Sequence, residues 1–176
     1  MGTESGISLE VPATVDALGQ NGGVSDTAPS DTATGGAAAW QRLCALIDDD
    51  PHLWPEVSEA LDEGDDPWEA LIGSLDDAGA LAYLDVDDTG MELADALAQL
   101  PRVFKLQPDL GEANDTDELR EAIAVADGIL AEGGLRLLLL EDDDDDAQAL
   151  VVVPAESVDD IVDLATSLGH TASSFG

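Results

Sequence analysis

The sequence LRLLLLEDDDDDAQALVVVP, residues 135–154, contains two apolar segments separated by a run of acids. The apolar segments are Leu135–Leu140 and Ala149–Val153, and Asp142–Asp146 lies between them. Two such segments joined by a short polar connection predict a β-hairpin. Because neither segment alternates between apolar and polar residues, we expect both faces of the hairpin to be covered, at least in part by helices.

The rest of the chain from residue 40 onward shows helical periodicity. Apolar residues recur at i, i+3, i+4 and i+7, which places them on one face of a helix. We expect these residues to form the buried faces of the helices: Trp40, Leu43, Cys44 and Ile47; Trp54, Val57 and Leu61; Trp68, Leu71, Ile72 and Leu75; Leu93, Leu97 and Leu100; Leu119, Ile123, Ala126 and Leu130; Val158, Ile161, Val162, Ala165 and Leu168.

Helix boundaries are marked by capping and stop signals. A capping side chain followed three residues later by Glu is typical of a helix start. Such starts are predicted at Asp66-Pro67-Trp68-Glu69, Thr89-x-x-Glu92 and Asp115-x-x-Glu118. Gly or Pro residues predict the ends: Pro51, Gly64, Gly79, Pro101, Gly133-Gly134 and Gly169. Ala80–Asp85 predicts a further strand, and Val103–Leu106 predicts a short strand or an extended link.

These elements predict an α+β fold, with a small antiparallel or mixed sheet of three to four strands packed against about five helices. We expect one domain over residues 37–176. Residues 1–36 are rich in Gly, Ser, Thr, Ala and Asp and contain no aromatic residue. Such a segment buries too little apolar surface to offset the entropy of ordering, so a disordered acidic tail is expected. Its one apolar patch, Leu9–Leu18, is interpreted as a solvated linker, with a short docking segment as the alternative.

The charge of the chain excludes some functions. Its 176 residues include 5 basic and 40 acidic side chains, a formal net charge of −35. Binding to nucleic-acid phosphates needs a basic stripe, and the basic residues here are scattered: Arg42, Arg102, Lys105, Arg120 and Arg136. Direct binding to nucleic acid or to an anionic membrane is therefore not expected. Three explanations of the acidity stay open: a solubilising surface, adaptation to a saline host, and imitation of a polyanion that binds a basic protein.

Targeting and redox signals are absent from the sequence. The longest apolar run, Leu135–Leu140, is too short to span a membrane, and the N-terminus lacks the pattern of a secretory signal. A cytoplasmic location is expected. Cys44 is the single cysteine, which excludes an intrachain disulfide and a cysteine-based zinc site.

The string Asp85-Val86-Asp87-Asp88-Thr89 resembles the Asp-x-Asp-x-Thr signature of haloacid-dehalogenase-type phosphatases. The resemblance implies that Asp85 attacks phosphorus, that Asp87 is the acid/base, and that the pair holds Mg²⁺. That chemistry also needs a downstream cation to neutralise the transferring phosphate. Lys105 lies too soon after the motif, and Gly90 replaces an aliphatic residue of that family. Thr89 is already explained as a helix cap, so a phosphatase-like hydrolase is the alternative hypothesis.

The acidic run Asp142–Asp146 invites a calcium interpretation, because hard cations bind carboxylate oxygens. An EF-hand loop that begins at Asp142 needs Gly and then Glu at positions where the chain has Ala147 and Val153. A loop that begins at Asp85 has Ala96 in place of the bidentate Glu. We expect a solvated turn, and no dedicated metal or cofactor site.

The remaining residues with chemical potential have simpler explanations. His52 and His170 adjoin no plausible nucleophile in the sequence, and the chain has neither a P-loop nor a nucleophile elbow. Cys44 is expected in the core. Trp40, Trp54 and Trp68 are expected to be core anchors, although a partly exposed one would mark a partner surface. No catalytic residue is predicted.

Four segments resemble an acidic bacterial family that is classed as a domain of unknown function. They are LCALIDDDP (Leu43–Pro51), DPWEAL (Asp66–Leu71), ALAYLD (Ala80–Asp85) and LVVVP (Leu150–Pro154). The resemblance covers about residues 40–170. It implies a small bacterial α+β domain and supplies no activity, ligand or catalytic residue.

The leading expectation is therefore a cytoplasmic, non-enzymatic acidic domain that acts through protein–protein contacts. One alternative is a Mg-dependent phosphatase-like hydrolase that uses Asp85 and Asp87. The other is a polyanion-mimicking inhibitor or immunity-type protein that binds a basic partner.

Overall fold

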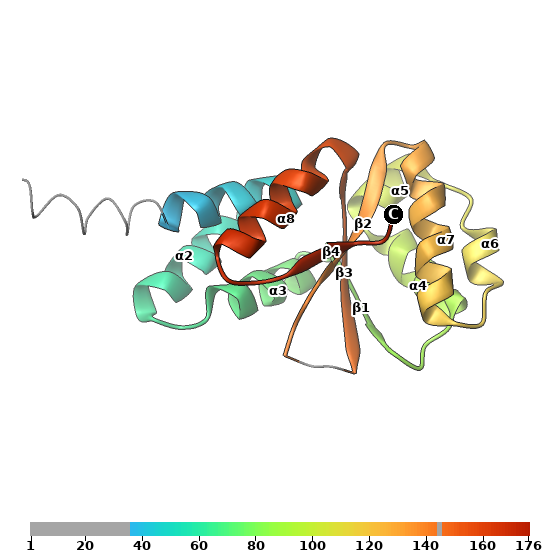
Figure 1. Cartoon of the computed structure of the whole chain (residues 1–176), viewed down its shortest axis with the longest axis horizontal. Coiled ribbons are helices and arrows are strands. Elements are labelled where there is room, and N and C mark those ends of the chain that lie inside the picture. Colours follow the sequence, from blue (N-terminus) through green and yellow to red (C-terminus); the bar gives the residue numbers. More distant parts are fainter. Residues whose placement is uncertain (1–35, 144–145) are drawn as a thin grey trace, which may run out of the picture. The chain divides into compact units, whose positions relative to one another are not determined.

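The computed structural model describes residues 36–143 and 146–176, which include the compact unit Ala39–Gly176. The described strands form one antiparallel sheet in the order β1-β3-β2-β4 (Figure 1). The strands are β1 (Leu81–Asp85), β2 (Leu135–Leu140), β3 (Ala147–Pro154) and β4 (Ala172–Ser174). The α+β prediction is confirmed. The predicted tail over residues 1–36, with its patch Leu9–Leu18, lies outside the described residues except for its last position.

Helices make up most of the remaining described chain. One helix covers residues 36–47. The others are α2 (Leu53–Glu63), α3 (Pro67–Asp77), α4 (Gly90–Gln99), α5 (Pro101–Leu106), α6 (Gly111–Asn114), α7 (Leu119–Glu132) and α8 (Val158–Ser167). A short 3-10 helix, η3 (Ala155–Ser157), joins β3 to α8.

The predicted hairpin is confirmed, because β2 and β3 pair antiparallel, with Leu137 opposite Val152 and Leu140 opposite Ala149. Side chains of successive strand residues point to opposite faces of a sheet. Leu138 and Val151 accordingly belong to one core cluster, whereas Leu137 and Leu150 belong to the other. Both faces of the hairpin are covered, which explains the apolar runs without alternation.

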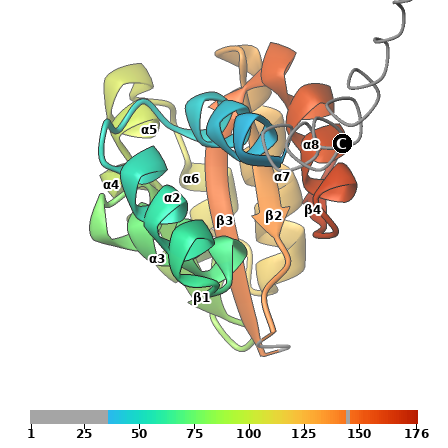
Figure 2. The ribbon, with the colours of Figure 1, turned by 90° about the vertical axis from the view of Figure 1, so that its left-hand side faces the viewer.

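Two layers of helices enclose the sheet. The helix at residues 39–47 packs on one face with α2, α3 and α8. The helices α4, α5, α6 and α7 pack on the other face. The two layers lie on opposite sides of the strands in Figures 1 and 2. The sheet therefore contributes to two separate apolar cores, one on each face.

Most predicted helix faces are buried, including Trp68, Leu71, Ile72 and Leu75 of α3. The predicted inward face of α2, with Trp54, Val57 and Leu61, also packs against the core. The buried residues of α2 are Leu53, Val57 and Ala60, whereas Trp54 and Leu61 are partly exposed. The helix begins at Leu53, and its buried stripe is flanked by Trp54 and Leu61, which pack against the same core cluster.

The segment Val103–Leu106 is helical, and its prediction as a strand or extended link was wrong. Pro101 ends α4, as predicted, but it also occupies the first turn of α5. Proline fits there because its ring fixes a helical φ and its missing N–H has no partner in the first turn. Leu100 has ψ of 134° and is buried, so the chain bends between the two helices at this residue.

The predicted helix start at Asp115-x-x-Glu118 was also wrong in position. Asp115 is the residue that caps the C-terminal end of α6, and its backbone N–H donates to the Gly111 carbonyl at 3.1 Å. The long helix α7 begins four residues later, at Leu119, and Glu118 makes no side-chain capping hydrogen bond there. The predicted buried face of α7, with Ile123, Ala126 and Leu130, is confirmed.

Candidate functional site

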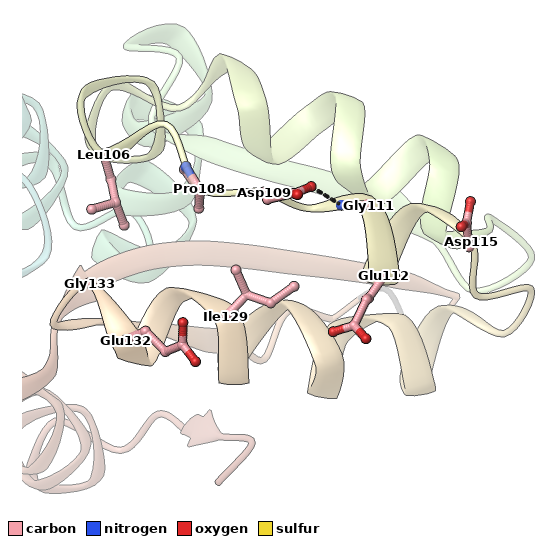
Figure 3. Close-up of a pocket in the computed structure, with 9 residues that line it drawn as sticks. All are labelled: Leu106, Pro108, Asp109, Gly111, Glu112, Asp115, Ile129, Glu132 and Gly133. Atoms are coloured by element: carbon pink, nitrogen blue, oxygen red, sulfur yellow. Dashed lines mark hydrogen bonds between the residues drawn. The ribbon is translucent and has the colours of Figure 1, made fainter.

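An acidic groove of about 680 Å³ lies between the segment at residues 106–115 and α7 (Figure 3). Four carboxylates line it: Asp109, Glu112, Asp115 and Glu132. Apolar surface comes from Leu106, Pro108 and Ile129. Figure 3 shows Ile129 projecting from α7 into the space below Pro108 and Asp109, with Glu112 on the opposite wall. The groove thus combines apolar side chains and carboxylates from both walls.

The upper wall of the groove is formed by a sharp reversal of the chain. Gln107 has φ of 52° and ψ of 52°, and its N–H donates to the Val103 carbonyl at 2.8 Å, which ends α5. The Asp109 side chain then accepts a hydrogen bond from the Gly111 N–H at 3.1 Å. This local bond is typical of Asp in turns. Together the two features bring the chain back across α7.

One end of the groove is closed by contact between Leu106 and Gly133. A Cβ atom at Gly133 would lie 2.4 Å from Leu106 Cδ2, which is far closer than two carbon atoms can approach. The missing side chain therefore makes room for Leu106. Gly133 has an ordinary φ of −93°, so it is this close approach, and not backbone strain, that favours glycine.

No Lys, Arg or His is found among the described residues that line the groove. Three of the five basic residues are engaged elsewhere. Arg42 lies 2.9 Å from Asp160, Arg136 lies 2.7 Å from Asp127, and Arg102 donates to the Val152 carbonyl at 2.8 Å. Lys105 is exposed on α5 but does not line the groove. The carboxylates of the groove consequently share one sign of charge with no neutralising side chain between them.

A family model described as a domain of unknown function (DUF6630) matches residues 39–175. The chain belongs to this DUF6630 family. The match agrees with the resemblance to a domain of unknown function that the sequence indicated. No curated protein matches the chain, and no solved structure matches it.

The phosphatase-like string of the DUF6630 domain lies at the end of β1, as expected. Asp85 and Asp87 are exposed. The Asp85 N–H donates to Asp88 Oδ2 at 2.9 Å, and the Asp88 N–H donates to the Asp85 carbonyl at 3.0 Å. This turn leads into α4, where Thr89 and Glu92 form the predicted capping box. Hydrogen bonding by the Thr89 hydroxyl lowers the pKa of Glu92.

The acidic run Asp142–Asp146 was expected to be a solvated turn without a dedicated metal site. Asp144 and Asp145 of the acidic run lie outside the described residues. Within residues 36–143 and 146–176, no group of three or more His, Cys, Asp or Glu side chains is placed to hold a metal ion. In the same ranges, none of the helices has both the length and the apolar character of a membrane span.

Trp40, Trp68 and His170 form a cluster that the sequence analysis did not predict. His170 stacks in parallel on Trp68, with ring centroids 4.6 Å apart, and its edge meets Trp40 at 5.6 Å. Trp68 Nε1 donates to the Glu141 carbonyl at 2.8 Å. Trp40 and Trp68 are buried and Trp54 is partly exposed. Cys44 is buried as predicted, and burial raises the pKa of its thiol to about 12.

Sequence reasoning did not find the acidic groove. Asp109, Glu112, Asp115 and Glu132 carry no local signature, because acidic residues occur throughout the chain. Gly133 was predicted as a helix stop, which it is, but its packing role depends on Leu106, 27 residues earlier. A contact of that kind has no periodicity that a sequence pattern could reveal.

Proposed function

We propose that this DUF6630 domain is a non-enzymatic protein that binds a basic partner, and that the acidic groove is its contact surface. The observation that carries the proposal is the pairing of four carboxylates with three apolar side chains in one groove. Protein interfaces typically join an apolar centre to a polar rim. Complementary charge accelerates association and rejects partners of the wrong sign.

The partner that fits this groove is a segment in which Lys or Arg alternates with large apolar residues. Its apolar side chains would bury Ile129 and Leu106. Its cations would face Glu112 and Glu132 on opposite walls. Phe104 of α5, two residues before Leu106, has 68 % of its surface exposed and offers further apolar area to a partner.

A second acidic groove, between α2 and α3, supplies a matched control. It is lined by Glu56, Glu59, Glu63, Asp65, Asp66 and Glu69, with Ala60 and Ala70 as its apolar residues. This groove has more carboxylates than the first one, but its apolar side chains are much smaller. If peptide binding depends on apolar contacts as well as charge, loss of charge in the first groove should weaken it more than the same loss in the second.

The experiment measures binding of a fluorescent synthetic Lys/Leu peptide by anisotropy at physiological salt. The double substitution Glu112→Gln/Glu132→Gln is expected to weaken binding at least tenfold, which corresponds to about 1.4 kcal/mol. The control Glu59→Gln/Glu63→Gln removes the same charge and should weaken it far less. Equal losses in the two variants would mean that charge alone attracts the peptide, and the groove assignment would be wrong.

The other hypotheses make different predictions. Hydrolysis of p-nitrophenyl phosphate with Mg²⁺, abolished by Asp85→Asn, would establish the phosphatase-like alternative in place of a pure binding role. An inhibitor or immunity-type role is the special case in which the basic partner is itself an enzyme or toxin. We also propose a cytoplasmic location, and adaptation to a saline environment as a contribution to the acidity, because extreme negative charge is a recognised feature of halophilic proteins.

A further inference from the structure

A pocket of about 410 Å³ differs in its chemistry from both acidic grooves. Its apolar lining residues are Val86, Leu119, Ile123, Leu139 and Phe175. Two polar residues complete the lining, Arg120 and Gln148. No Asp or Glu is among these described lining residues, although the chain has 40 acidic residues. The size is typical of pockets that bind small molecules, about 300–1,000 Å³.

The pocket lies where the sheet face that packs against α4, α5, α6 and α7 meets the start of α7. Leu139 of β2 packs against that core, and Gln148 of β3 lies on the same face by alternation with Leu150. Leu119, Arg120 and Ile123 belong to the first turns of α7. Val86 follows β1 and Phe175 follows β4, so the ends of all four strands and one helix contribute to the pocket.

Arg120 is the one cation among the described residues that line the pocket. In the part of the chain that the structure describes, the Arg120 side chain has no hydrogen-bond or ion-pair partner, whereas Arg42, Arg102 and Arg136 each have one. Gln148 donates through Nε2 to the Ala147 carbonyl at 3.2 Å, which leaves its Oε1 as an acceptor. The polar part of the pocket thus offers a guanidinium and an amide oxygen beside a largely hydrocarbon wall.

We propose that this pocket binds a small carboxylic acid with a hydrocarbon tail. The tail lies against Ile123, Leu139 and Phe175, and the carboxylate pairs with the guanidinium of Arg120. Arginine is well suited to this role because its planar fork can donate two hydrogen bonds to one carboxylate. The Gln148 amide oxygen accepts a hydrogen bond from a hydroxyl or N–H group on the ligand, where one is present.

The surrounding negative charge gives this interaction an unusual dependence on salt. The neighbours in sequence of the lining residues include Asp85, Asp87, Glu118 and Glu121, which repel an approaching carboxylate. Added salt screens that repulsion over distances beyond the Debye length, about 8 Å at physiological ionic strength. Binding of the acid is therefore expected to strengthen with added NaCl, whereas binding of a basic peptide to the acidic groove should weaken.

The test uses octanoate as the probe and 1-octanol as its neutral counterpart, with binding followed by amide chemical shifts in ¹H–¹⁵N NMR spectra of the full chain. Octanoate at millimolar concentration is expected to shift the signals of Ile123, Leu139 and Phe175. Its affinity should fall about tenfold in Arg120→Gln, a change of about 1.4 kcal/mol, and stay unchanged in Arg42→Gln. Affinity should rise between low and high NaCl.

A further variant tests the pocket itself. Val86 is 47 % exposed at the pocket, so Val86→Trp is expected to fill the space without disturbing the core, and near-UV circular dichroism checks that the fold is kept. This variant should lose octanoate. The proposal is wrong if octanoate causes no shifts at the pocket, if octanol binds as tightly as octanoate, or if Arg120→Gln binds octanoate as well as the original chain.

Discussion

Among the described glycines, Gly90 is the one at which an added methyl group would make the closest contact. A Cβ atom there would lie 1.8 Å from the Ala113 carbonyl oxygen and 2.6 Å from that of Thr116. The Gly90 N–H donates to the Thr116 carbonyl at 2.9 Å, so the first turn of α4 rests directly on the chain that leaves α6. Both clashing atoms belong to the backbone, and no side chain can rotate to relieve the contact.

We therefore predict that Gly90→Ala destabilises the domain by about 1–3 kcal/mol, the usual cost of overpacking. Gly73→Ala is the matched control, because its Cβ would meet nothing within 4 Å in the middle of α3. That substitution should stabilise the domain by about 0.5–1 kcal/mol, since alanine favours helix more than glycine does. Urea unfolding at fixed salt measures both changes, and equal signs for the two variants would contradict the argument.

Among the elements, α5 depends on one side chain that ties three parts of the fold together. Arg102 Nη1 donates to the carbonyls of Ile47 and Val152, and its side chain is only 16 % exposed. Ile47 ends the helix at residues 36–47, where carbonyl groups lack partners within the helix and attract cations. Val152 belongs to β3, so Arg102 joins one helix of each layer to the sheet.

Arg102→Ala is predicted to lower the free energy of unfolding by about 2 kcal/mol, because charged hydrogen bonds to buried carbonyls are lost. Arg102→Lys should recover part of this loss, since one ammonium cannot reproduce the planar fork. Arg42→Ala is the control. Its ion pair with Asp160 is exposed and should contribute less than about 1 kcal/mol. Chemical denaturation of the three variants gives the comparison, and a loss in Arg42→Ala as large as in Arg102→Ala would count against this role of Arg102.

How well each element could be predicted depended on whether its signal was local. The hairpin, the α4 capping box and the buried face of α3 each follow from one continuous short stretch of sequence, and all are present. The helix α5 was missed because Pro101 can end one helix and begin the next, and the contacts of Arg102 that favour the helix are distant in sequence. The strand β4 has just three residues and pairs with the free edge of β2, which its own composition does not reveal.

The candidate sites were less predictable than the fold for the same physical reason. The acidic groove requires Leu106 to pack on Gly133, and the apolar pocket requires Phe175 to lie near Ile123. Both are contacts between distant segments. In the string Asp85-Val86-Asp87-Asp88-Thr89, Asp85 and Asp88 form a turn and Thr89 caps α4, so its local structure, unlike the groove and the pocket, follows from neighbouring residues. Local patterns thus identified most of the elements, whereas the residues that line the groove and those that line the pocket come together only in the packed fold.

For the whole molecule, net charge sets the dominant dependence on conditions. A formal charge of −35 means that compaction forces like charges together, which destabilises the folded state. Few cations oppose this effect, because Arg102 and Arg136 are committed to internal contacts. We predict a melting temperature that climbs steeply from about 0.01 M to about 1 M NaCl, as the Debye length falls from about 30 Å to about 3 Å.

The same salt series near pH 4 distinguishes screening from a general effect of salt on apolar burial. Carboxylates titrate in this range, with ordinary pKa values of about 3.9 for Asp and 4.3 for Glu, so much of the repulsion is already removed. If repulsion controls stability, the melting temperature should depend less on NaCl at pH 4 than at pH 7. If salt acts through exclusion from the protein surface, the two slopes should agree. A melting temperature that does not change with NaCl at pH 7 would show that the carboxylates are spaced widely enough for water alone to separate their charges.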